Sequence, residues 1–344
     1  MTKKVLFVIN SLKNKAGSER VACLLANLFF YEMNMDITII TRNSSEIAYE
    51  LDSKINIKII NGNFLSFLYK LQLNILHEPP DVVIVHNMGK LSLLCSLLRT
   101  TAKLISLEHV SFSIRPRYIR FLSKILYRRF NTIISLSAQD ANEYALWHNN
   151  VAHINNVSPF KINDKAYDIT NRNIIAIGRL TEQKNFQHLL YAWEKCYSQL
   201  NEWTLNIYGT GEDRDNLSNL ILERKIRSVN LKGEVKNLED IYKNSAFIVM
   251  SSKYEGLPMV LIEAQSIGLP IVSYDCPTGP SEIIKHDKDG LLVENQNIDE
   301  LAKAILYLAT NHTKRLNMSN NALSAAERFS SKTILMHWEK ILLY

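Results

Sequence analysis

The stretch that decides the fold runs from Ala246 to Ala264 and reads AFIVMSSKYEGLPMVLIEA. Its first five residues form a continuous apolar run, which is typical of a buried strand in a parallel sheet. Pro258 suits the first turn of a helix, so the stretch predicts a strand, a loop and a helix in that order. Glu255 therefore falls in the loop after the strand, and Glu263 follows eight residues later inside the helix.

This placement favours a ligand site, because ligands of open α/β sheets bind at the carboxyl ends of the strands. A helix that starts there offers free backbone N–H groups and a positive dipole end to an anion, so a phosphate-bearing ligand fits. Glu263 is placed to accept hydrogen bonds from vicinal hydroxyls such as those of a ribose, and Glu255 to face a second polyol. The alternative interpretation is that both are solvated surface acids.

A second segment, residues 173–185, reads NIIAIGRLTEQKN and again joins an apolar strand to a turn and a helix start. It carries Arg179 and Lys184, five positions apart. A forked guanidinium and a point-like ammonium at this spacing suit the oxygens of one diphosphate. Taken alone, an Arg and a Lys at the end of a strand are more often ordinary surface charges. Beside Glu255 and Glu263, they predict one half of a nucleoside-diphosphate site.

At these residues the chain resembles the retaining family 4 glycosyltransferases, which have two facing Rossmann-like domains (GT-B type), and the resemblance covers nearly the whole length. It implies that Arg179 and Lys184 bind the donor diphosphate, that Glu263 binds the ribose, and that Glu255 with the backbone of 256–260 binds sugar and phosphate. The donor-binding residues that it implies are Gly17, Gly178, Arg179, Lys184, Gly209, Val235, Glu255, Gly256, Leu257, Pro258, Met259, Val260 and Glu263, and the implied catalytic residues are Glu255, His109, Arg179 and Lys184.

Further segments carry the same resemblance. Residues 207–211 and 231–235 match it, the second near the nucleobase, and residues 275–284 are similar to bacterial galactosyl- and N-acetylgalactosaminyl-type members. Residues 16–20 resemble a Gly-Gly-Ala-Glu-Arg loop that approaches the donor phosphates, with Ala16 at the first Gly. Gly17 still allows close backbone approach, whereas a positive φ at Ala16 would be costly.

His109 follows the predicted strand at 103–107, and the resemblance implies that it faces the donor sugar. There it would orient a sugar hydroxyl or the acceptor. The alternative is a purely structural histidine.

The length of 344 residues predicts two domains, since one core rarely grows so large. We expect an α/β fold of two facing, doubly wound parallel-sheet domains, with 156–172 as linker. The domain at 1–160 is expected to bind the acceptor and to face the membrane, and the domain at 173–325 to bind the nucleotide sugar. Residues 326–344 are expected to form a helix that returns to the first domain and docks through Trp338, Ile341 and Leu342.

Regular strands and helices account for the rest of the prediction. In the first half we expect strands at 5–9, 36–41, 56–60, 82–86, 103–107 and 132–136, with helices such as 18–31 and 91–98.

The four cysteines lack metal-ligand spacing and are expected to be reduced packing residues. No apolar run approaches the roughly 18 residues of a membrane span, and residues 1–4 lead directly into a strand, so a cytoplasmic location is expected.

Positive charge is concentrated in the first half of the chain. Residues 1–165 hold 20 Lys and Arg against 12 Asp and Glu, a net of +8, whereas residues 166–344 hold 20 against 22, a net of −2. Residues 113–130 are the densest part, with several aromatic residues and no acid; their cations are Arg115, Arg117, Arg120, Lys124, Arg128 and Arg129.

A basic amphipathic helix of this kind suits an anionic membrane surface, here the inner face of the plasma membrane. The apolar helix at 64–71 either joins it there or covers the sheet. An ordinary surface helix is the alternative interpretation of 113–130. Nucleic acid is not expected as a partner, because no recognised nucleic-acid motif accompanies the charge.

Taken with these observations, the resemblance implies a sugar transferase that moves a hexose or N-acetylhexosamine from a UDP-sugar to a polyprenyl-diphosphate-linked glycan, in polysaccharide or O-antigen assembly. Retention of configuration is implied by the resemblance alone. No cofactor or metal is required: the Asp-Arg-Asp at 213–215 lies at a predicted helix start, where acids complement the dipole. The alternatives are a nucleotide-sugar epimerase, a glycan phosphorylase, or an idle membrane- or nucleic-acid-binding module.

Overall fold

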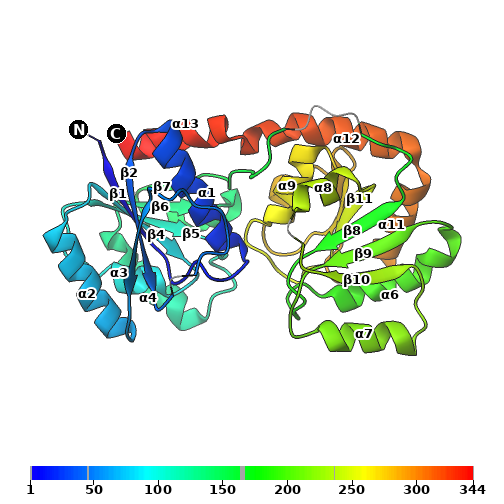
Figure 1. The fold of residues 1–344 in the computed structure, drawn as a ribbon, viewed down its shortest axis with the longest axis horizontal. Helices are drawn as coiled ribbons and strands as arrows, with labels where there is room; N and C mark the ends of the chain where they lie inside the picture. Colours follow the sequence, from blue (N-terminus) through cyan, green and yellow to red (C-terminus); the bar gives the residue numbers. More distant parts are fainter. Residues whose placement is uncertain (1, 45, 163–166, 236, 344) are drawn as a thin grey trace. The chain divides into compact units, whose positions relative to one another are not determined.

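The computed structural model describes residues 2–44, 46–162, 167–235 and 237–343. The chain divides into two compact units, unit 1 (Met1–Val157 with Ser331–Tyr344) and unit 2 (Ser158–Ser330). Each unit has a parallel sheet with helices packed on it, so the predicted α/β fold of two Rossmann-like domains is confirmed (Figure 1).

The sheet of unit 1 has the strand order β3-β2-β1-β4-β5-β6-β7, and all its neighbouring strands are parallel. Its strands are β1 (Lys4–Val8), β2 (Asp36–Arg42), β3 (Asn56–Ile60), β4 (Val82–Asn87), β5 (Lys103–Glu108), β6 (Thr132–Ser135) and β7 (Val151–His153). The predicted strands agree with these to within a residue or two. The short edge strand β7 was not predicted, because three partly exposed residues leave no apolar run to recognise.

Helices cover both faces of this sheet. They are α1 (Gly17–Glu32), α2 (Phe64–His77), α3 (Leu91–Cys95), α4 (Arg117–Leu126), the 3-10 turn η1 (Tyr127–Arg129), α5 (Ala138–Ala145) and α13 (Ser331–Leu343). Side chains alternate along β1, as a strand requires. Leu6 and Val8 join the core under α2, α3 and α4, whereas Phe7 packs edge-on against Phe29 of α1.

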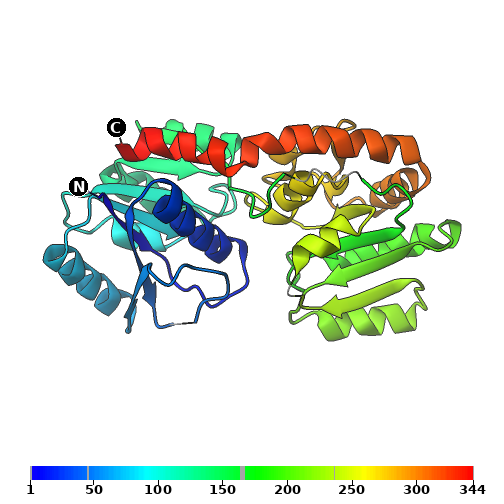
Figure 2. The ribbon, with the colours of Figure 1, turned by 45° about the horizontal axis from the view of Figure 1, so that its top comes forward.

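Helix α13 belongs to unit 1 although unit 2 separates it from the rest of that unit in the sequence, as predicted (Figures 1 and 2). Ile334, Trp338 and Leu342 are buried, and the Trp338 ring lies 5.2 Å from that of Phe29. Of the predicted docking residues, Ile341 is only half-buried. The apolar stripe along one side of α13 therefore holds the C-terminal helix on unit 1.

Unit 2 repeats the plan with the strand order β10-β9-β8-β11-β12-β13, again all parallel. The strands are β8 (Asn173–Ile177), β9 (Thr204–Tyr208), β10 (Val229–Gly233), β11 (Phe247–Met250), β12 (Ile271–Tyr274) and β13 (Gly290–Val293). The helices are α6 (Phe186–Cys196), η2 (Tyr197–Gln199), α7 (Arg214–Glu223), α8 (Leu238–Lys243), α9 (Met259–Ile267), α10 (Pro280–Ile283), α11 (Ile298–Thr310), α12 (His312–Ala326) and η3 (Glu327–Phe329).

The strand order reverses direction once in each sheet, between β1 and β4 in unit 1 and between β8 and β11 in unit 2. At such a switch point the helices that follow the two strands leave on opposite faces of the sheet, which opens a crevice at the carboxyl ends. The loops after β8 and β11 are the two segments that the sequence singles out. The fold therefore brings both motifs to one place.

The basic stretch 113–130 is not one helix. Pro116 ends the preceding loop with φ −52°, and α4 begins at Arg117. Proline lacks an N–H and clashes with the turn before it, so it stands at the helix start and not inside. Residues 113–115 consequently belong to the loop between β5 and α4.

The four cysteines are buried and free, as expected for packing residues. Asp213 precedes α7 and Asp215 lies in its first turn, where both complement the helix dipole.

Candidate active site

The loop after β8 and the loop after β11 are joined by several hydrogen bonds. The backbone N–H of Lys253 donates to the carbonyl of Gln183 at 2.8 Å, and the Ser251 hydroxyl donates to the carbonyl of Lys184 at 3.0 Å. The Gln183 amide donates in return to the carbonyl of Tyr254 at 3.0 Å. The two loops therefore form one rigid rim at the switch point of unit 2.

Lys184 and Glu255 form an ion pair across this rim, with Nζ 2.5 Å from Oε1. Both side chains are mostly buried, with exposed fractions of 18% and 9%. The Lys184 stem passes directly beneath Gly178, where a Cβ would stand only 3.2 to 3.3 Å from the stem carbons. A Cβ at Gly178 would therefore require the lysine stem to shift by a few tenths of an ångström, so this glycine leaves the space that the stem occupies.

Arg179 lies on the same loop, and its side chain is exposed. Across the described part of the chain, no side chain or carbonyl holds its guanidinium. An Arg fork with five free donors at the edge of a crevice is suited to bidentate contact with a phosphate. Lys184 is thus positioned by the protein, and Arg179 is left available to an anion.

A third loop, residues 277–279, braces Glu255 from the other side. The Glu255 N–H donates to the carbonyl of Pro277 at 2.9 Å, and the Thr278 N–H donates to the carbonyl of Glu255 at 3.1 Å. Gly279 has φ +102°, and a Cβ there would lie 2.2 Å from the carbonyl oxygen of Gly256. This supporting role was not predicted from the sequence, although the Thr-Gly-Pro triplet at 278–280 is typical of a tight turn.

Residues 256–260 lead from this rim into α9, which begins at Met259 with Pro258 as its N-cap. Pro258 thus stands just before the first turn and not within it. Gly256 and Val260 are half-buried, and Leu257 and Met259 are buried. The first N–H groups of a helix have no partner within it, so this end of α9 supplies donors for an anion.

Glu263 lies a turn further along α9 and is wholly buried. Its carboxylate accepts a hydrogen bond from the Tyr242 hydroxyl at 2.8 Å. A ribose would reach Glu263 only after a rearrangement that exposes this carboxylate. The ribose contact therefore stays a prediction.

The remaining donor residues of unit 2 flank the same end of the sheet. Gly209 follows β9 with φ +140°, and a Cβ there would lie 1.9 Å from the carbonyl oxygen of Gly178. Only glycine permits the loops after β8 and β9 to approach so closely. Val235 lies just after β10 and is half-buried. The structure thus gathers the loops after β8, β9 and β11 around Gly178.

Gly17 lies in unit 1, where it is exposed as the first residue of α1. Ala16 precedes it with φ −120° and ψ 165°, an extended conformation that any residue adopts. The anticipated strain at Ala16 is therefore absent. The phosphate contact of Gly17 stays a prediction.

His109 follows β5 in unit 1 and is half-buried. Its Nε2 lies 3.1 Å from Nδ1 of His86, and the two rings are stacked with centroids 5.2 Å apart. Burial lowers the pKa of His109 to about 4, outweighing the opposite effect of Glu108, and it lowers the pKa of His86 well below the usual value. A neutral imidazole of such low basicity suits the orientation of a hydroxyl better than the removal of its proton.

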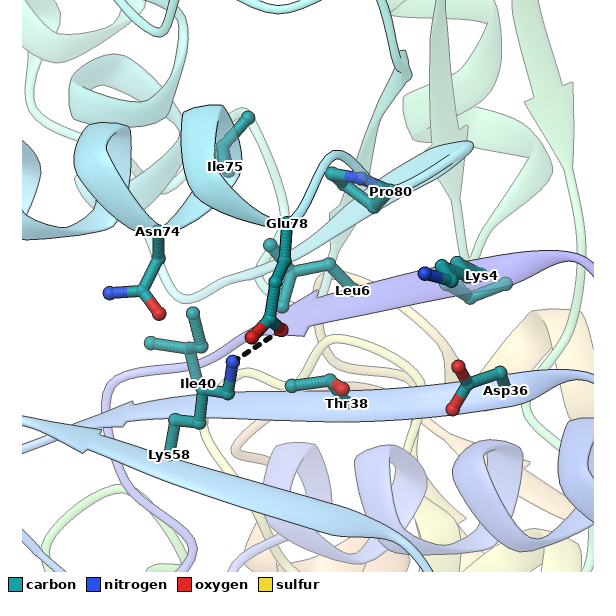
Figure 3. Close-up of a pocket in the computed structure, with 11 residues that line it drawn as sticks. Lys4, Leu6, Asp36, Thr38, Ile40, Lys58, Asn74, Ile75, Glu78 and Pro80 are labelled. Carbon is teal, nitrogen blue, oxygen red and sulfur yellow. Dashed lines mark hydrogen bonds and ion pairs between the residues drawn. The ribbon is translucent and has the colours of Figure 1, made fainter.

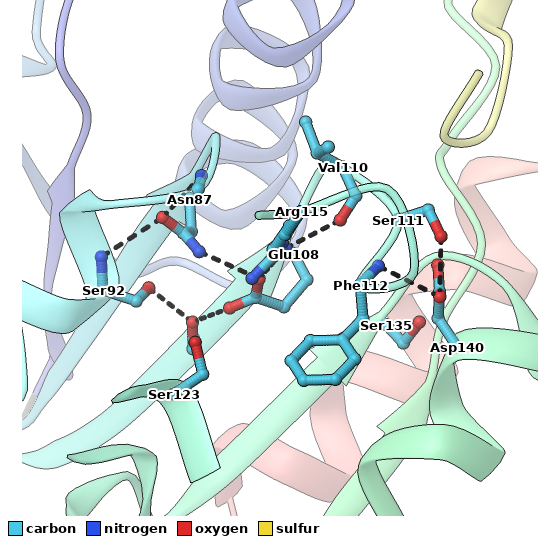
Figure 4. A network of polar contacts seen from close by, with 12 residues as sticks. Asn87, Ser92, Glu108, Val110, Ser111, Phe112, Arg115, Ser123, Ser135 and Asp140 are labelled. Atoms are coloured by element: carbon cyan, nitrogen blue, oxygen red, sulfur yellow. Dashed lines mark hydrogen bonds and ion pairs between the residues drawn. The ribbon is translucent and has the colours of Figure 1, made fainter. Parts of the chain in front are cut away.

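The prediction that Arg115 is one of the membrane-facing cations is wrong, because its side chain is buried. Its guanidinium is buried against the Glu108 carboxylate and also donates to the carbonyl of Val110 at 2.7 Å (Figure 4). Glu108 accepts further hydrogen bonds from the Asn87 amide at 2.9 Å and the Tyr144 hydroxyl at 3.1 Å. Arg115 therefore has a structural role: its contacts with Glu108 and Val110 stabilise the loop after β5.

The other cations of the basic stretch lie toward solvent. Arg117, Lys124, Arg128 and Arg129 are exposed, and Arg120 is half-buried. Large apolar side chains are exposed between them, namely Tyr118, Phe121, Leu122 and Ile125. The inner face of α4 is narrow, with Ile119 and Ser123 buried. The helix is thus amphipathic as predicted, but much of its apolar surface is uncovered.

A small cavity of about 70 Å³ lies where α2 crosses β1, β2 and β3 (Figure 3). The Lys58 ammonium at its wall pairs with Glu78 at 2.6 Å. None of the predicted site residues lines it.

Among residues 2–44, 46–162, 167–235 and 237–343, no three His, Cys, Asp or Glu side chains lie close enough together to hold a metal ion. Within those ranges, too, no helix combines the length and apolarity needed to cross a bilayer.

Comparisons with known proteins agree with this geometry. The sequence model of the family described as Glycosyl transferases group 1 matches residues 159–325. The amylovoran biosynthesis glycosyltransferase AmsD of Erwinia amylovora is 33% identical, over 98% of this chain and 99% of that protein. An N-acetyl-D-galactosaminyltransferase of Campylobacter jejuni, named for a saccharide on PP-undecaprenol, is 26% identical over 98% of both chains.

Solved structures share the fold. A variant of TarM from S. aureus, crystallised with UDP, α-GlcNAc-glycerol and fondaparinux, superposes with a TM-score of 0.85 over 100% of both chains, at 16% identity. By its full-length similarity to AmsD and by the family match across unit 2, this chain belongs to the group 1 glycosyltransferases.

Proposed function

We propose that the protein is a retaining hexosyl- or N-acetylhexosaminyltransferase of family 4 type that uses a UDP-sugar. The observation that carries the proposal is the rim of unit 2, where the Lys184–Glu255 pair lies just before α9 and the loop after β8 also carries the exposed Arg179, whose guanidinium has no partner among the described residues. The UDP bound to the S. aureus TarM variant supports the choice of donor. The residues of the rim have the charge and the free donors that a nucleoside diphosphate requires.

The proposed reaction breaks the bond between the sugar C1 and the β-phosphate oxygen, and its electron pair stays on the departing UDP. A bond forms between C1 and an acceptor hydroxyl oxygen on the same face, and the hydroxyl proton passes to the departing phosphate. Arg179, Lys184 and the N–H groups of α9 face the charge that develops on the phosphate. Preorganised donors of this kind lower a barrier by several kcal/mol, and no step needs a metal or cofactor.

The acceptor is proposed to be a polyprenyl-diphosphate-linked glycan in polysaccharide or O-antigen assembly. The C. jejuni relative named for PP-undecaprenol supports this class. We further propose a cytoplasmic protein bound peripherally to the inner face of the plasma membrane, since α4 exposes Tyr118 and Phe121 between its cations. Such a surface suits anionic lipid, in which the rings insert and the cations pair with headgroups.

Calorimetric titration with UDP tests the donor site. Wild-type protein is expected to bind UDP, and Arg179→Ala to weaken binding by roughly 10- to 100-fold, because charged hydrogen bonds contribute about 1.5–3 kcal/mol. The matched control is Arg172→Ala, which removes an exposed cation paired with Glu202 just before the other end of β8.

A hydrolysis screen with UDP-glucose, UDP-galactose and their N-acetyl forms then identifies the sugar. Absence of UDP binding, or equal affinity in the Arg179→Ala variant, contradicts the proposal and favours an idle binding module.

A further inference from the structure

A larger cavity, of about 340 Å³, lies in unit 1 at the switch point between β1 and β4. Its walls come from the loops after β1, β4 and β5, together with the first residues of α2 and α4; the lining residues are Asn10, Phe64, Met88, Gly89, Lys90, Val110, Ile114, Arg115, Pro116 and Ile119. Its size falls within the range of small-molecule sites, and its position is where open α/β sheets bind ligands.

The walls of this cavity are largely apolar, with polar groups at particular points. Phe64, Val110 and Ile114 contribute apolar surface, whereas the Asn10 side chain has a buried Oδ1 without a hydrogen-bond partner among the described residues. An unpaired buried acceptor is costly, so it indicates a group that is satisfied when a ligand binds.

The charge around the cavity is positive. Lys90 lines it, and the Arg42 guanidinium stacks on the Phe64 ring at 3.8 Å. Neither cation has an ion-pair partner in the described part of the chain, and the described lining includes no acid. Arg115 also reaches the wall, but Glu108 neutralises it. The free charge therefore complements an anion next to an apolar group.

The two helices that begin at this cavity expose apolar side chains beyond it. On α2, Leu65 and Tyr69 are exposed, and on α4, Tyr118 and Phe121 are exposed. Helix α3 contacts both α2 and α4, so the three lie in one layer on the sheet. Both helices that contribute lining residues therefore also carry exposed apolar side chains, which an amphiphile in a bilayer could contact.

We propose that this cavity binds the lipid end of the acceptor, with the first isoprene units against Phe64, Val110 and Ile114 and the diphosphate near Lys90 and Arg42. The proposal rests on the proposed function, which supplies a polyprenyl-diphosphate-linked acceptor. It assigns to unit 1 the recognition of the carrier, independently of the glycan attached to it.

Farnesyl diphosphate is the probe, titrated calorimetrically into the full chain with saturating UDP so that the rim of unit 2 is occupied. Farnesol and inorganic pyrophosphate are titrated in parallel. We expect farnesyl diphosphate to bind at least tenfold more tightly than either fragment, because only the whole molecule uses the apolar wall and the cations together. Ile114→Glu and, independently, Met88→Glu place an acid at the cavity and should each weaken its binding at least tenfold.

The matched control is Leu146→Glu, since Leu146 is 84% exposed at the end of α5 and does not line the cavity. It should leave the affinity for farnesyl diphosphate unchanged, and the melting temperatures of all variants are compared to establish folding. Equal binding of pyrophosphate and farnesyl diphosphate, or unchanged affinity in both cavity variants, overturns the proposal. UDP affinity, measured separately, reports on the donor site alone, so failure of this inference and failure of the proposed function are distinguishable.

Discussion

Each unit carries a glutamate–cation pair at the carboxyl end of its sheet, and the two pairs differ in what surrounds them. In unit 1, Glu108 and Arg115 have exposed fractions of 1% and 2%, and Asn87 and Tyr144 also donate to the carboxylate. In unit 2, the Lys184–Glu255 pair is 18% and 9% exposed, and the loop that carries Lys184 also carries Arg179, which is exposed and has no partner among the described residues. The Glu108 carboxylate thus has its hydrogen-bond partners within the protein, whereas the loop that carries Lys184 also carries an exposed guanidinium that can bind a ligand.

This difference shows how the same kind of ion pair can serve either to stabilise a loop or to act in catalysis. A buried charge that lacks a partner is expensive, so saturation around Glu108 stabilises the loop after β5 but leaves nothing for a substrate. A pair at the edge of a crevice can exchange its partner for a phosphate or a sugar hydroxyl. The identity of the residues is similar in both places, and their surroundings decide the role.

The largest effect is expected from breaking the saturated pair. Arg115→Met leaves the Glu108 carboxylate buried without its cation, which should destabilise unit 1 by about 3–5 kcal/mol. For a unit of this size the loss corresponds to a fall of roughly 6 to 20 °C in melting temperature, measured by scanning calorimetry. The control, Arg117→Met, removes an exposed cation two residues away and should melt like wild type. Equal melting of the two variants would show that the buried pair is dispensable.

Breaking the second pair should affect turnover more than folding. Lys184→Ala and Glu255→Ala are each expected to reduce kcat by a factor on the order of 10² to 10³, the usual loss when a preorganised electrostatic group is removed. Melting temperatures should fall by less than in Arg115→Met, because Lys184 and Glu255 keep exposed fractions of 18% and 9%, so the charge left behind retains some contact with water.

The control for this test is Lys253→Ala on the same rim, whose partner Glu182 is exposed on the surface. It should retain near-normal turnover. A fall in turnover as large in Lys253→Ala as in Lys184→Ala, or normal turnover in both pair variants, would refute the assignment of the site.

The smallest effect concerns the cations of unit 1 that remain exposed. Arg117→Gln and Arg128→Gln should each weaken binding to vesicles of anionic lipid by about 1 kcal/mol, since each removes one cation near the surface. Lys54→Gln removes an exposed cation away from α4 and serves as the control in the same sedimentation assay. Partitioning that is unchanged in both arginine variants would contradict membrane binding through α4.

Much of the fold follows from the sequence because buried parallel strands leave continuous apolar runs, such as Phe247–Met250. The rim of unit 2 could also be predicted, since Lys184 and Glu255 each lie just after such a run. The burial of Arg115 could not be predicted, because a cation in a basic stretch is expected to be exposed unless its ion-pair partner is known. That partner, Glu108, lies seven residues earlier on a strand.

The bracing of Glu255 by residues 277–279 was also beyond prediction. Its hydrogen bonds join backbone groups far apart in the chain, and backbone groups carry no residue identity to recognise. The cavity of unit 1 escaped the sequence analysis for a related reason. Its walls come from four separate segments of the chain, each of which on its own resembles an ordinary loop or helix start.

The sequence by itself determined the alternation of strands and helices, the loops that carry the motifs, and the cations and acids available there, because these depend on local periodicity and residue type. The tertiary structure alone decided which charges are saturated and which are free, as with Arg115 and Arg179. The physical reason is that the burial and the hydrogen-bond partners of a charge come from segments distant in the chain, and these surroundings determine whether it stabilises the fold or remains available to a substrate.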